Sequence, residues 1–441
     1  MTNTKKTKQI LLVMLVYSFA LIFTALILGD IPNSFKGLYE IIAHPAQLTI
    51  DYFNLASPAT TFLNAGLVGL GVCLVFYLSL FELNAASLMA YFLTVGFSFF
   101  GINIMNMWPC IIGTYLYSCL KKLSFASNVN IVIFATSLAP FVSEMILRYL
   151  LFDNLPNALL FKVLSGIIIG LIAGFLMPPL FMHSPNIHKG YTLYSAAAIA
   201  GFIGILLYAC LYGARGIAVP TNTSIGESHK LLVNTFGIVT SIIMLIVGCY
   251  YNKWSFKGIR GLFKNQGYRT DFIKQYGLSK TLINLGLFGL FTIAYYNFIN
   301  APFTGPTMGS IICLLAIAPC GAHIFNMWPI MLGYIIAATF GAFNINTQAI
   351  VVGLSFAGAL VPIVGCYGVL SGIVAGFIHA SIVTTVVTFH GGFCLYNGGF
   401  TSAIVAIILV PVLESFFIHN DEIKLLPSIK KIKCISIEVN P

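Results

Sequence analysis

The second half of the chain contains a long stretch without a single charged residue. Residues 281–413 hold no Asp, Glu, Lys or Arg, and the whole chain of 441 residues has only 22 basic and 12 acidic residues. Charged residues make up 8% of the chain, against roughly 25% in an ordinary soluble protein. A soluble fold of this size cannot cover its surface with so few charges. The composition therefore predicts an all-α multi-pass membrane protein and excludes a cytosolic enzyme or a secreted disulfide scaffold.

The basic residues give the expected orientation. Lys5, Lys6 and Lys8 precede an apolar run at 9–29, which is longer than the core of a cleavable signal and predicts an uncleaved first helix. Basic residues also gather in the 252–280 connection and in the tail, at Lys424, Lys430, Lys431 and Lys433. Because basic segments stay in the cytoplasm, we expect a protein of the cell membrane with both termini cytoplasmic. The net charge of +10 then requires no nucleic-acid partner.

An internal duplication organises the chain. Residues 61–70 (TFLNAGLVGL) match 281–290 (TLINLGLFGL), and Asn-Met-Trp-Pro at 106–109 recurs at 326–329, both at an offset of 220. Further on, His-Lys-Gly-Tyr-Thr-Leu-Tyr at 188–194 pairs with His-Gly-Gly-Phe-Cys-Leu-Tyr at 390–396. Since the order of the blocks is kept, the chain consists of two copies of one unit.

Each copy contains about seven apolar segments. They lie near 9–29, 59–82, 84–103, 105–120, 128–150, 158–182 and 195–213, and near 230–251, 281–298, 305–322, 324–344, 347–366, 368–389 and 399–418. An odd number of spans per copy makes the copies insert with opposite orientation. We therefore expect two inverted-topology repeats, at 1–220 and 221–420, followed by a cytoplasmic tail at 421–441. Whether the 84–120 and 305–344 pairs are full spans or re-entrant hairpins stays open.

Inverted repeats place a substrate site near the midplane, where broken helices free backbone groups. The two Asn-Met-Trp-Pro segments are the best candidates for such breaks, because proline lacks an amide donor. The predicted substrate-binding residues are Asn103, Asn106, Trp108, Thr304, Thr307, His323, Asn326 and Trp328. The alternative is that each motif only caps a helix and that its Trp anchors at the membrane interface.

Two further groups of residues are candidates. The corresponding histidine loops predict a gate or a polar turn, through His188, Tyr194, His390, Tyr396 and Asn397. Glu144 and Arg148 are four residues apart on one expected helix, so they can pair there, either structurally or to couple an ion. The chain contains no metal-ligand spacing, nucleophile motif or phosphate-binding loop, so we expect no metal, no cofactor and no enzymatic activity.

The duplicated Asn-Met-Trp-Pro unit, with its His-x-Gly-aromatic-x-Leu-Tyr loop, resembles a family of bacterial membrane proteins of unknown function, catalogued as family 1576. That resemblance covers nearly the whole chain and implies no activity. A fainter one is to urea transporters, which also have two inverted repeats, through residues 64–70 and the Trp-Pro segment that follows. The second Pro-Phe expected there is missing from this chain, which puts a urea site in doubt.

These observations favour a transporter or channel for a small neutral or weakly polar solute, bound at the midplane between the repeats. A strongly anionic solute would need Lys or Arg at depth, and the second copy has none. The alternatives are a urea-transporter-like passive channel and a membrane-embedded enzyme acting on a lipid or isoprenoid. The expected partners are the lipid bilayer and a small solute, with a homo-oligomer left open.

Overall fold

The computed structural model describes residues 5–29, 31–149, 153–219, 226–341, 343–420 and 422–429. The described residues are mostly helical, and the strands among them are β1 (Phe417–Ile418) and β2 (Ser428–Ile429), which pair antiparallel. Lys430, Lys431 and Lys433, which we assigned to the cytoplasmic tail, lie outside the described residues.

The helices follow the two copies. In the first copy they are α1 (Lys5–Leu28), α2 (Ile31–Ile42), α3 (Tyr52–Leu55), α4 (Pro58–Ser79), α5 (Ala85–Phe97), α6 (Trp108–Leu120), α7 (Phe125–Ala135), η1 (Thr136–Leu138), α8 (Pro140–Leu147), α9 (Ala158–Phe181), α10 (Ser184–His188), α11 (Ser195–Leu211) and η3 (Gly213–Arg215). In the second copy they are α12 (Lys230–Tyr251), α13 (Ile259–Lys264), α14 (Phe272–Tyr276), α15 (Leu278–Phe298), α16 (Gly305–Ile317), η4 (Ala318–Cys320), α17 (Ile324–Phe340), α18 (Gln348–Ala357), η5 (Gly358–Leu360), α19 (Val361–Tyr367), α20 (Val369–Val386), η6 (Val387–His390) and α21 (Asn397–Phe416).

Many of these helices have the length and composition of membrane spans. Within the described residues, nine are long and apolar enough to cross a membrane, or ten when the pair α7–α8, bent by 43°, counts as one span. The predicted segments recur with small shifts in their ends, and the one at 230–251 coincides with α12. The prediction of an all-α polytopic membrane protein is therefore confirmed.

Two pairs of apolar segments are shorter than full spans. Helices α5, α6 and α16 each have 13 residues and α17 has 17. At 1.5 Å per residue, 13 residues cover roughly 20 Å, less than the roughly 30 Å of a hydrocarbon core. Of the two alternatives for the 84–120 and 305–344 pairs, these lengths favour re-entrant hairpins.

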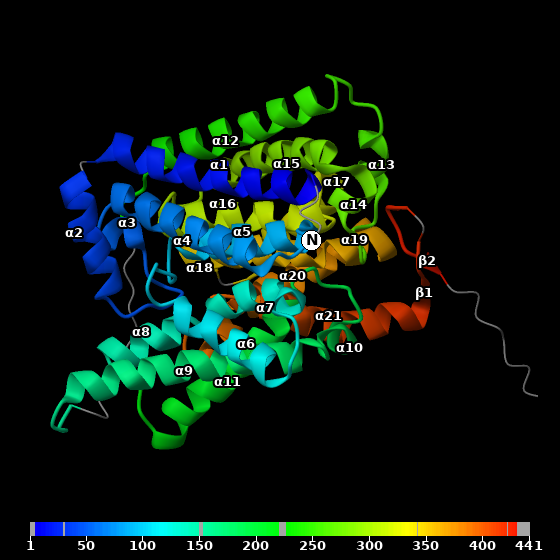
Figure 1. Ribbon diagram of the computed structural model, residues 1–441. Helices are drawn as coiled ribbons and strands as arrows, with labels where there is room; N and C mark the ends of the chain where they lie inside the picture. Colours follow the sequence, from blue (N-terminus) through cyan, green and yellow to red (C-terminus); the bar gives the residue numbers. More distant parts are fainter. Residues whose placement is uncertain are drawn as a thin grey trace, which may run out of the picture.

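Helices α5 and α16 form the centre of the molecule (Figure 1), with α1, α12 and α15 along one side and α9 and α11 along the other. The two helices touch backbone to backbone. A Cβ atom on Gly96 would lie 2.7 Å from the Gly309 carbonyl oxygen, and one on Gly309 would lie 2.3 Å from that of Gly96. This approach requires glycine at both positions, because a side chain would force the helices apart.

Candidate functional site

The turn between α5 and α6 is built by the Asn-Met-Trp-Pro segment of the first copy. The Asn103 and Asn106 side chains each accept a hydrogen bond from the other residue's backbone N–H, at 2.8 and 2.9 Å. Asn106 Nδ2 also donates to the Gly101 carbonyl and to Ser143 Oγ, both at 3.0 Å. Both ends of the Asn106 amide therefore make hydrogen bonds that hold the turn. This is the role that the capping alternative gives to the motif.

The second copy builds its turn in the same way. His323 N–H donates to Asn326 Oδ1 at 2.9 Å, and Asn326 Nδ2 donates to the Gly321 carbonyl at 2.9 Å. The His323 ring replaces the Asn103 side chain, and its Nε2 donates to the Asn265 carbonyl at 2.9 Å. Trp108 is partly buried and Trp328 is 38% exposed.

A second pair of asparagines supports these turns, and we did not expect it. Asn64 Nδ2 donates to the carbonyls of Ser98 and Ile102, both at 2.9 Å. At an offset of 220, Asn284 Nδ2 donates to the carbonyls of Ala318 and Ala322, at 3.2 and 2.8 Å. Both asparagines belong to the repeated block at 61–70 and 281–290, so the duplication was the signal that could have identified them.

Two aspartates, one in each copy, accept hydrogen bonds from the backbone of the other copy. Asp51 Oδ1 accepts from Phe53 N–H at 2.9 Å, and so caps α3, and from Gly305 N–H at 3.1 Å at the start of α16. Asp271 caps α14 through Lys274 N–H at 2.7 Å and accepts from Ala85 N–H at 3.3 Å at the start of α5. Ala85 and Gly305 are themselves 220 residues apart, so the two contacts are reciprocal.

These contacts show that α5 and α16 run antiparallel. The Asp51 region reaches the start of α16 and also the end of α5, where Tyr52 N–H donates to the Phe99 carbonyl at 3.4 Å. Asp271 reaches the start of α5, at the end of the molecule that carries residues 252–280 and that we call the basic end. The two Asn-Met-Trp-Pro turns therefore lie at opposite ends of the α5–α16 pair, roughly 20 Å apart at 1.5 Å per residue. Asn106 and Asn326 do not share one site.

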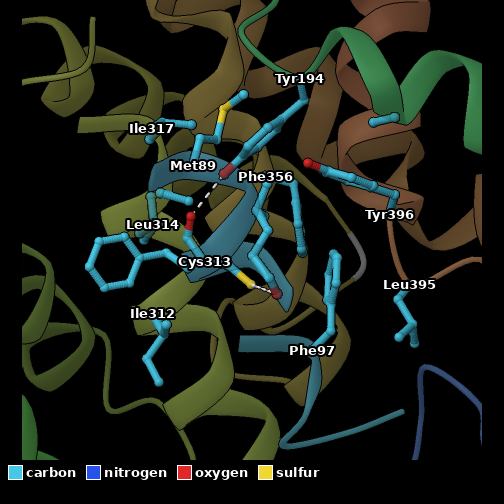
Figure 2. Close-up of a cluster of buried hydrophobic side chains, with 14 of the residues drawn as sticks. Met89, Phe97, Tyr194, Ile312, Cys313, Leu314, Ile317, Phe356, Leu395 and Tyr396 are labelled. Carbon is cyan, nitrogen blue, oxygen red and sulfur yellow. Dashed lines mark hydrogen bonds between the residues drawn. The ribbon is translucent and has the colours of Figure 1, made fainter. Parts of the chain in front are cut away.

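Buried aromatic rings fill the space between the two turns. Tyr194 and Tyr396, which correspond in the two histidine loops, have ring centroids 5.5 Å apart. Each also packs on a phenylalanine of the other copy, Tyr194 on Phe356 at 5.7 Å and Tyr396 on Phe134 at 6.3 Å. Figure 2 shows Tyr194 donating to the Cys313 carbonyl, at 2.9 Å. Two of the predicted gate residues thus meet at the centre of the molecule.

The histidines of those loops lie apart and hold turns. His188 Nδ1 accepts from Gly190 N–H at 3.1 Å, so its Nε2 carries the proton toward Ser184 Oγ, also at 3.1 Å. His390 Nδ1 accepts from Cys394 N–H at 3.4 Å, and its Nε2 donates to Asn397 Oδ1 at 3.0 Å. Burial lowers the pKa of His188 to about 4, since an imidazolium would lose its hydration there. Both rings are neutral parts of a polar turn.

Each histidine loop hydrogen-bonds to a 3-10 turn in the other copy. Leu193 N–H donates to the Ala359 carbonyl at 2.9 Å, and Leu395 N–H donates to the Ser137 carbonyl at 3.0 Å. Ala359 lies in η5 and Ser137 in η1, the 3-10 turns that follow α18 and α7. Each copy therefore holds a loop of the other copy at a corresponding turn.

The predicted pair of Glu144 and Arg148 forms. Arg148 Nε lies 2.9 Å from both Glu144 carboxylate oxygens, and Nη2 lies 2.6 Å from Oε2. The Tyr212 hydroxyl also donates to Glu144, which is completely buried. The second copy has Cys366 at the position of Glu144, so this ionic cluster belongs to one copy only.

A cavity of about 290 Å³ lies at the end opposite the basic end. Its lining includes Thr49, Thr347, Gln348, Thr384 and Asn397 among mostly apolar residues, and it reaches Phe356 of the central aromatic cluster. None of the residues that line it is charged. Of the predicted site residues, only Asn397 lines this cavity.

The polar groups around the cavity form a network. Thr304 Oγ1 donates to Gln348 Oε1 at 2.5 Å, and Gln348 Nε2 donates to Thr307 Oγ1 at 3.1 Å. The two predicted threonines therefore lie behind Gln348, one residue away from the cavity. The Asn397 amide holds His390 and, through Nδ2 at 3.0 Å, the Val383 carbonyl.

A buried histidine lies beneath the cavity, at a position that sequence reasoning missed. His379 Nε2 donates to the carbonyl of Gly398, which lines the cavity, at 2.8 Å, and its Nδ1 accepts from the Tyr334 hydroxyl at 2.6 Å. The signal that could have identified His379 was a histidine within an apolar segment that has no charged residue.

Comparison with known proteins identifies the family. The chain matches the family described as Protein of unknown function (DUF1576) over residues 31–212 and 251–415. It belongs to that family. The two matched ranges fall one in each copy. No curated protein and no solved structure matches the chain, so the resemblance to urea transporters finds no support there.

Proposed function

We propose that this family member is a transporter or channel for a small neutral or weakly polar solute, built from two repeats of inverted topology. The observation that carries this proposal is the pair of corresponding contacts that each copy makes to the other. Asp51 binds the start of α16 while Asp271 binds the start of α5, and α5 and α16 are antiparallel. A two-fold relation that reverses one copy against the other allows a single path to open to each side in turn.

The cavity supplies the entry to such a path. It holds hydroxyl, amide and aromatic groups and no charge, which fits a neutral solute better than an ion, because an ion would need charged or many convergent polar partners. Gln348 lines the cavity and is held by Thr304 and Thr307, and Asn397 lines it with its amide held by His390 and the Val383 carbonyl. In this proposal the Asn-Met-Trp-Pro turns hold the short helices α5, α6, α16 and α17, which flank the path.

The orientation follows from the basic residues. With residues 252–280 and both termini in the cytoplasm of a cell-membrane protein, the cavity opens to the outside. The central rings of Tyr194, Tyr396 and Phe356 then separate it from the cytoplasmic side. Glu144 and Arg148, buried near Tyr212, are the groups available to couple an ion.

The experiment is a flux assay in proteoliposomes, with urea, ammonia, amino acids and small polyols as solutes. We expect entry of at least one uncharged solute, and we expect Thr384→Trp to reduce its initial rate to that of liposomes without protein. Thr384 lines the cavity, whereas the adjacent exposed Thr385 does not, so Thr385→Trp is the matched control. Equal rates for the two variants would contradict the proposed path.

A further inference from the structure

A second cavity lies on the side of the molecule formed by α1 and α12. It has a volume of about 420 Å³ and lies between the two helices, with the start of α15 at one end. Its walls are mainly aliphatic, and Tyr17 and Met244, both buried, lie at its base. The exposed residues Leu12, Val16 and Ile243 line it from the side that faces the membrane. We call this cavity the α1–α12 groove.

The groove extends over about half of a membrane span. Along α1 it runs from Gln9 to Ala20, which is roughly 16 Å at 1.5 Å per residue. One leaflet contributes roughly 15 Å to a hydrocarbon core of roughly 30 Å. Gln9 lies with Tyr251 and Ser279 at the basic end, and the other end, at Ala20 and Thr240, is in the middle of both helices. A partner helix would need a full-length surface, whereas a lipid chain of one leaflet fits this length.

Six lysines lie within a few residues, along the chain, of the groove's polar end. Lys5, Lys6 and Lys8 precede Gln9, Lys253 and Lys257 follow Tyr251, and Lys280 follows Ser279. The ion pairs among the described residues involve other lysines and arginines, so none of these six has a carboxylate partner there. Exposed aromatic side chains at Tyr250, Trp254 and Phe256 add the pattern of a membrane interface.

We propose that the α1–α12 groove is a binding site for one anionic phospholipid from the leaflet at the basic end. One acyl chain lies between Val16 and Met244, and the phosphate lies among the lysines that have no carboxylate partner. Excess positive charge next to a membrane attracts anionic headgroups, and the groove supplies the apolar contact that fixes one lipid in place. This site is separate from the proposed solute path and does not depend on it.

Native mass spectrometry of the purified full-length protein tests the proposal, with phosphatidylglycerol and phosphatidylcholine of identical chains as the two probes. We expect one phosphatidylglycerol to be retained, with at least about tenfold lower affinity for phosphatidylcholine. The triple change Lys5→Gln, Lys6→Gln and Lys8→Gln should remove this preference, and Val16→Trp should reduce retention of both lipids by filling the groove.

Phe19→Trp is the matched control, because Phe19 is 57% exposed on α1 and does not line the groove. It should bind both lipids as the unchanged protein does. Equal binding of the two lipids by the unchanged protein would overturn the headgroup assignment. Retention unaffected by Val16→Trp would overturn the groove, and the lysine triple change keeps the proposal testable if Val16→Trp does not fold.

Discussion

The two ends of the molecule contact the corresponding histidine loops through different groups. At the cavity end, Leu48 N–H donates to the Gly392 carbonyl at 2.9 Å, and Leu48 and Thr49 line the open cavity. At the basic end, the residues 220 positions later are Tyr268 and Arg269, and their side chains donate to the Lys189 carbonyl, at 2.9 and 3.0 Å. Leu48 and Thr49 leave space at one end, and the larger Tyr268 and Arg269 side chains occupy it at the other.

More aromatic residues join this contact at the basic end. Tyr268 packs on Tyr191 with ring centroids 4.8 Å apart, Tyr191 hydrogen-bonds Tyr367 at 2.9 Å, and His419 packs on Tyr268 at 5.4 Å. A shallow cleft touches Tyr191 and Tyr367, but its lining does not correspond to that of the cavity. Large side chains therefore distinguish the basic end from the cavity end, and substitution of these side chains can test the difference.

The largest expected effect concerns the cluster that only the first copy has. Glu144→Ala leaves the buried guanidinium nitrogens of Arg148 without their carboxylate partner, so we expect it to lower the free energy of unfolding by about 3–5 kcal/mol. Cys366→Ala, at the corresponding position of the second copy, should cost about 1 kcal/mol, since it removes one buried sulfur. Unfolding in detergent with increasing denaturant measures both, and equal losses would show that the ionic cluster adds no stability of its own.

The next effect should appear in both copies. Asn64→Ala and Asn284→Ala each leave two buried carbonyls without a donor, at about 1–3 kcal/mol for each unsatisfied group. The Nδ2 hydrogen bonds of the two residues correspond, but only Asn64 Oδ1 also accepts a hydrogen bond, from Ile104 N–H at 3.2 Å, so Asn64→Ala should lose about 1 kcal/mol more than Asn284→Ala. The same denaturant series provides the measurement. A loss confined to one variant would mean that only one of the two turns depends on its asparagine.

A smaller effect is expected at the basic end, where Tyr268→Ala removes the ring that packs on Tyr191 and should give water better access to the interior. Ser195 corresponds to Asn397 of the cavity, so a Ser195→Cys reporter tests whether water reaches the equivalent position. In a background with the exposed Cys119 and Cys210, and with Cys434 outside the described residues, changed to Ser, we expect Tyr268→Ala to speed thiol labelling of this reporter by on the order of tenfold, which corresponds to about 1.4 kcal/mol of opening. An unchanged labelling rate would argue that Tyr268 does not close this end.

The sequence predicted the fold better than the site. Hydropathy located the apolar segments, and the repeat at 106–109 and 326–329 located the turns. Chemistry alone could not decide the role of Asn106, because an amide that caps a turn and one that binds a solute have the same donors and acceptors. Gln348 and His379 were missed since their counterparts, Ala126 and Met177, are apolar, so the repeat gave no signal. The contact between Asp51 and Gly305 joins residues 254 positions apart, and no local pattern indicates it.

The smallest expected effect is the dependence of stability on pH through His188. Burial holds the pKa of His188 near 4 in the folded state, below the roughly 6.5 of an exposed histidine in the unfolded chain. Its contribution to stability is therefore complete above pH 6.5 and is lost as the pH falls toward 4, because the unfolded chain binds the proton first. Between those values we expect His188→Gln to lose about 1 kcal/mol less stability per pH unit than the unchanged protein. Denaturant unfolding at pH 7, 6 and 5 measures the difference. Parallel pH curves for the two proteins would mean that the His188 turn opens and takes up its proton without unfolding.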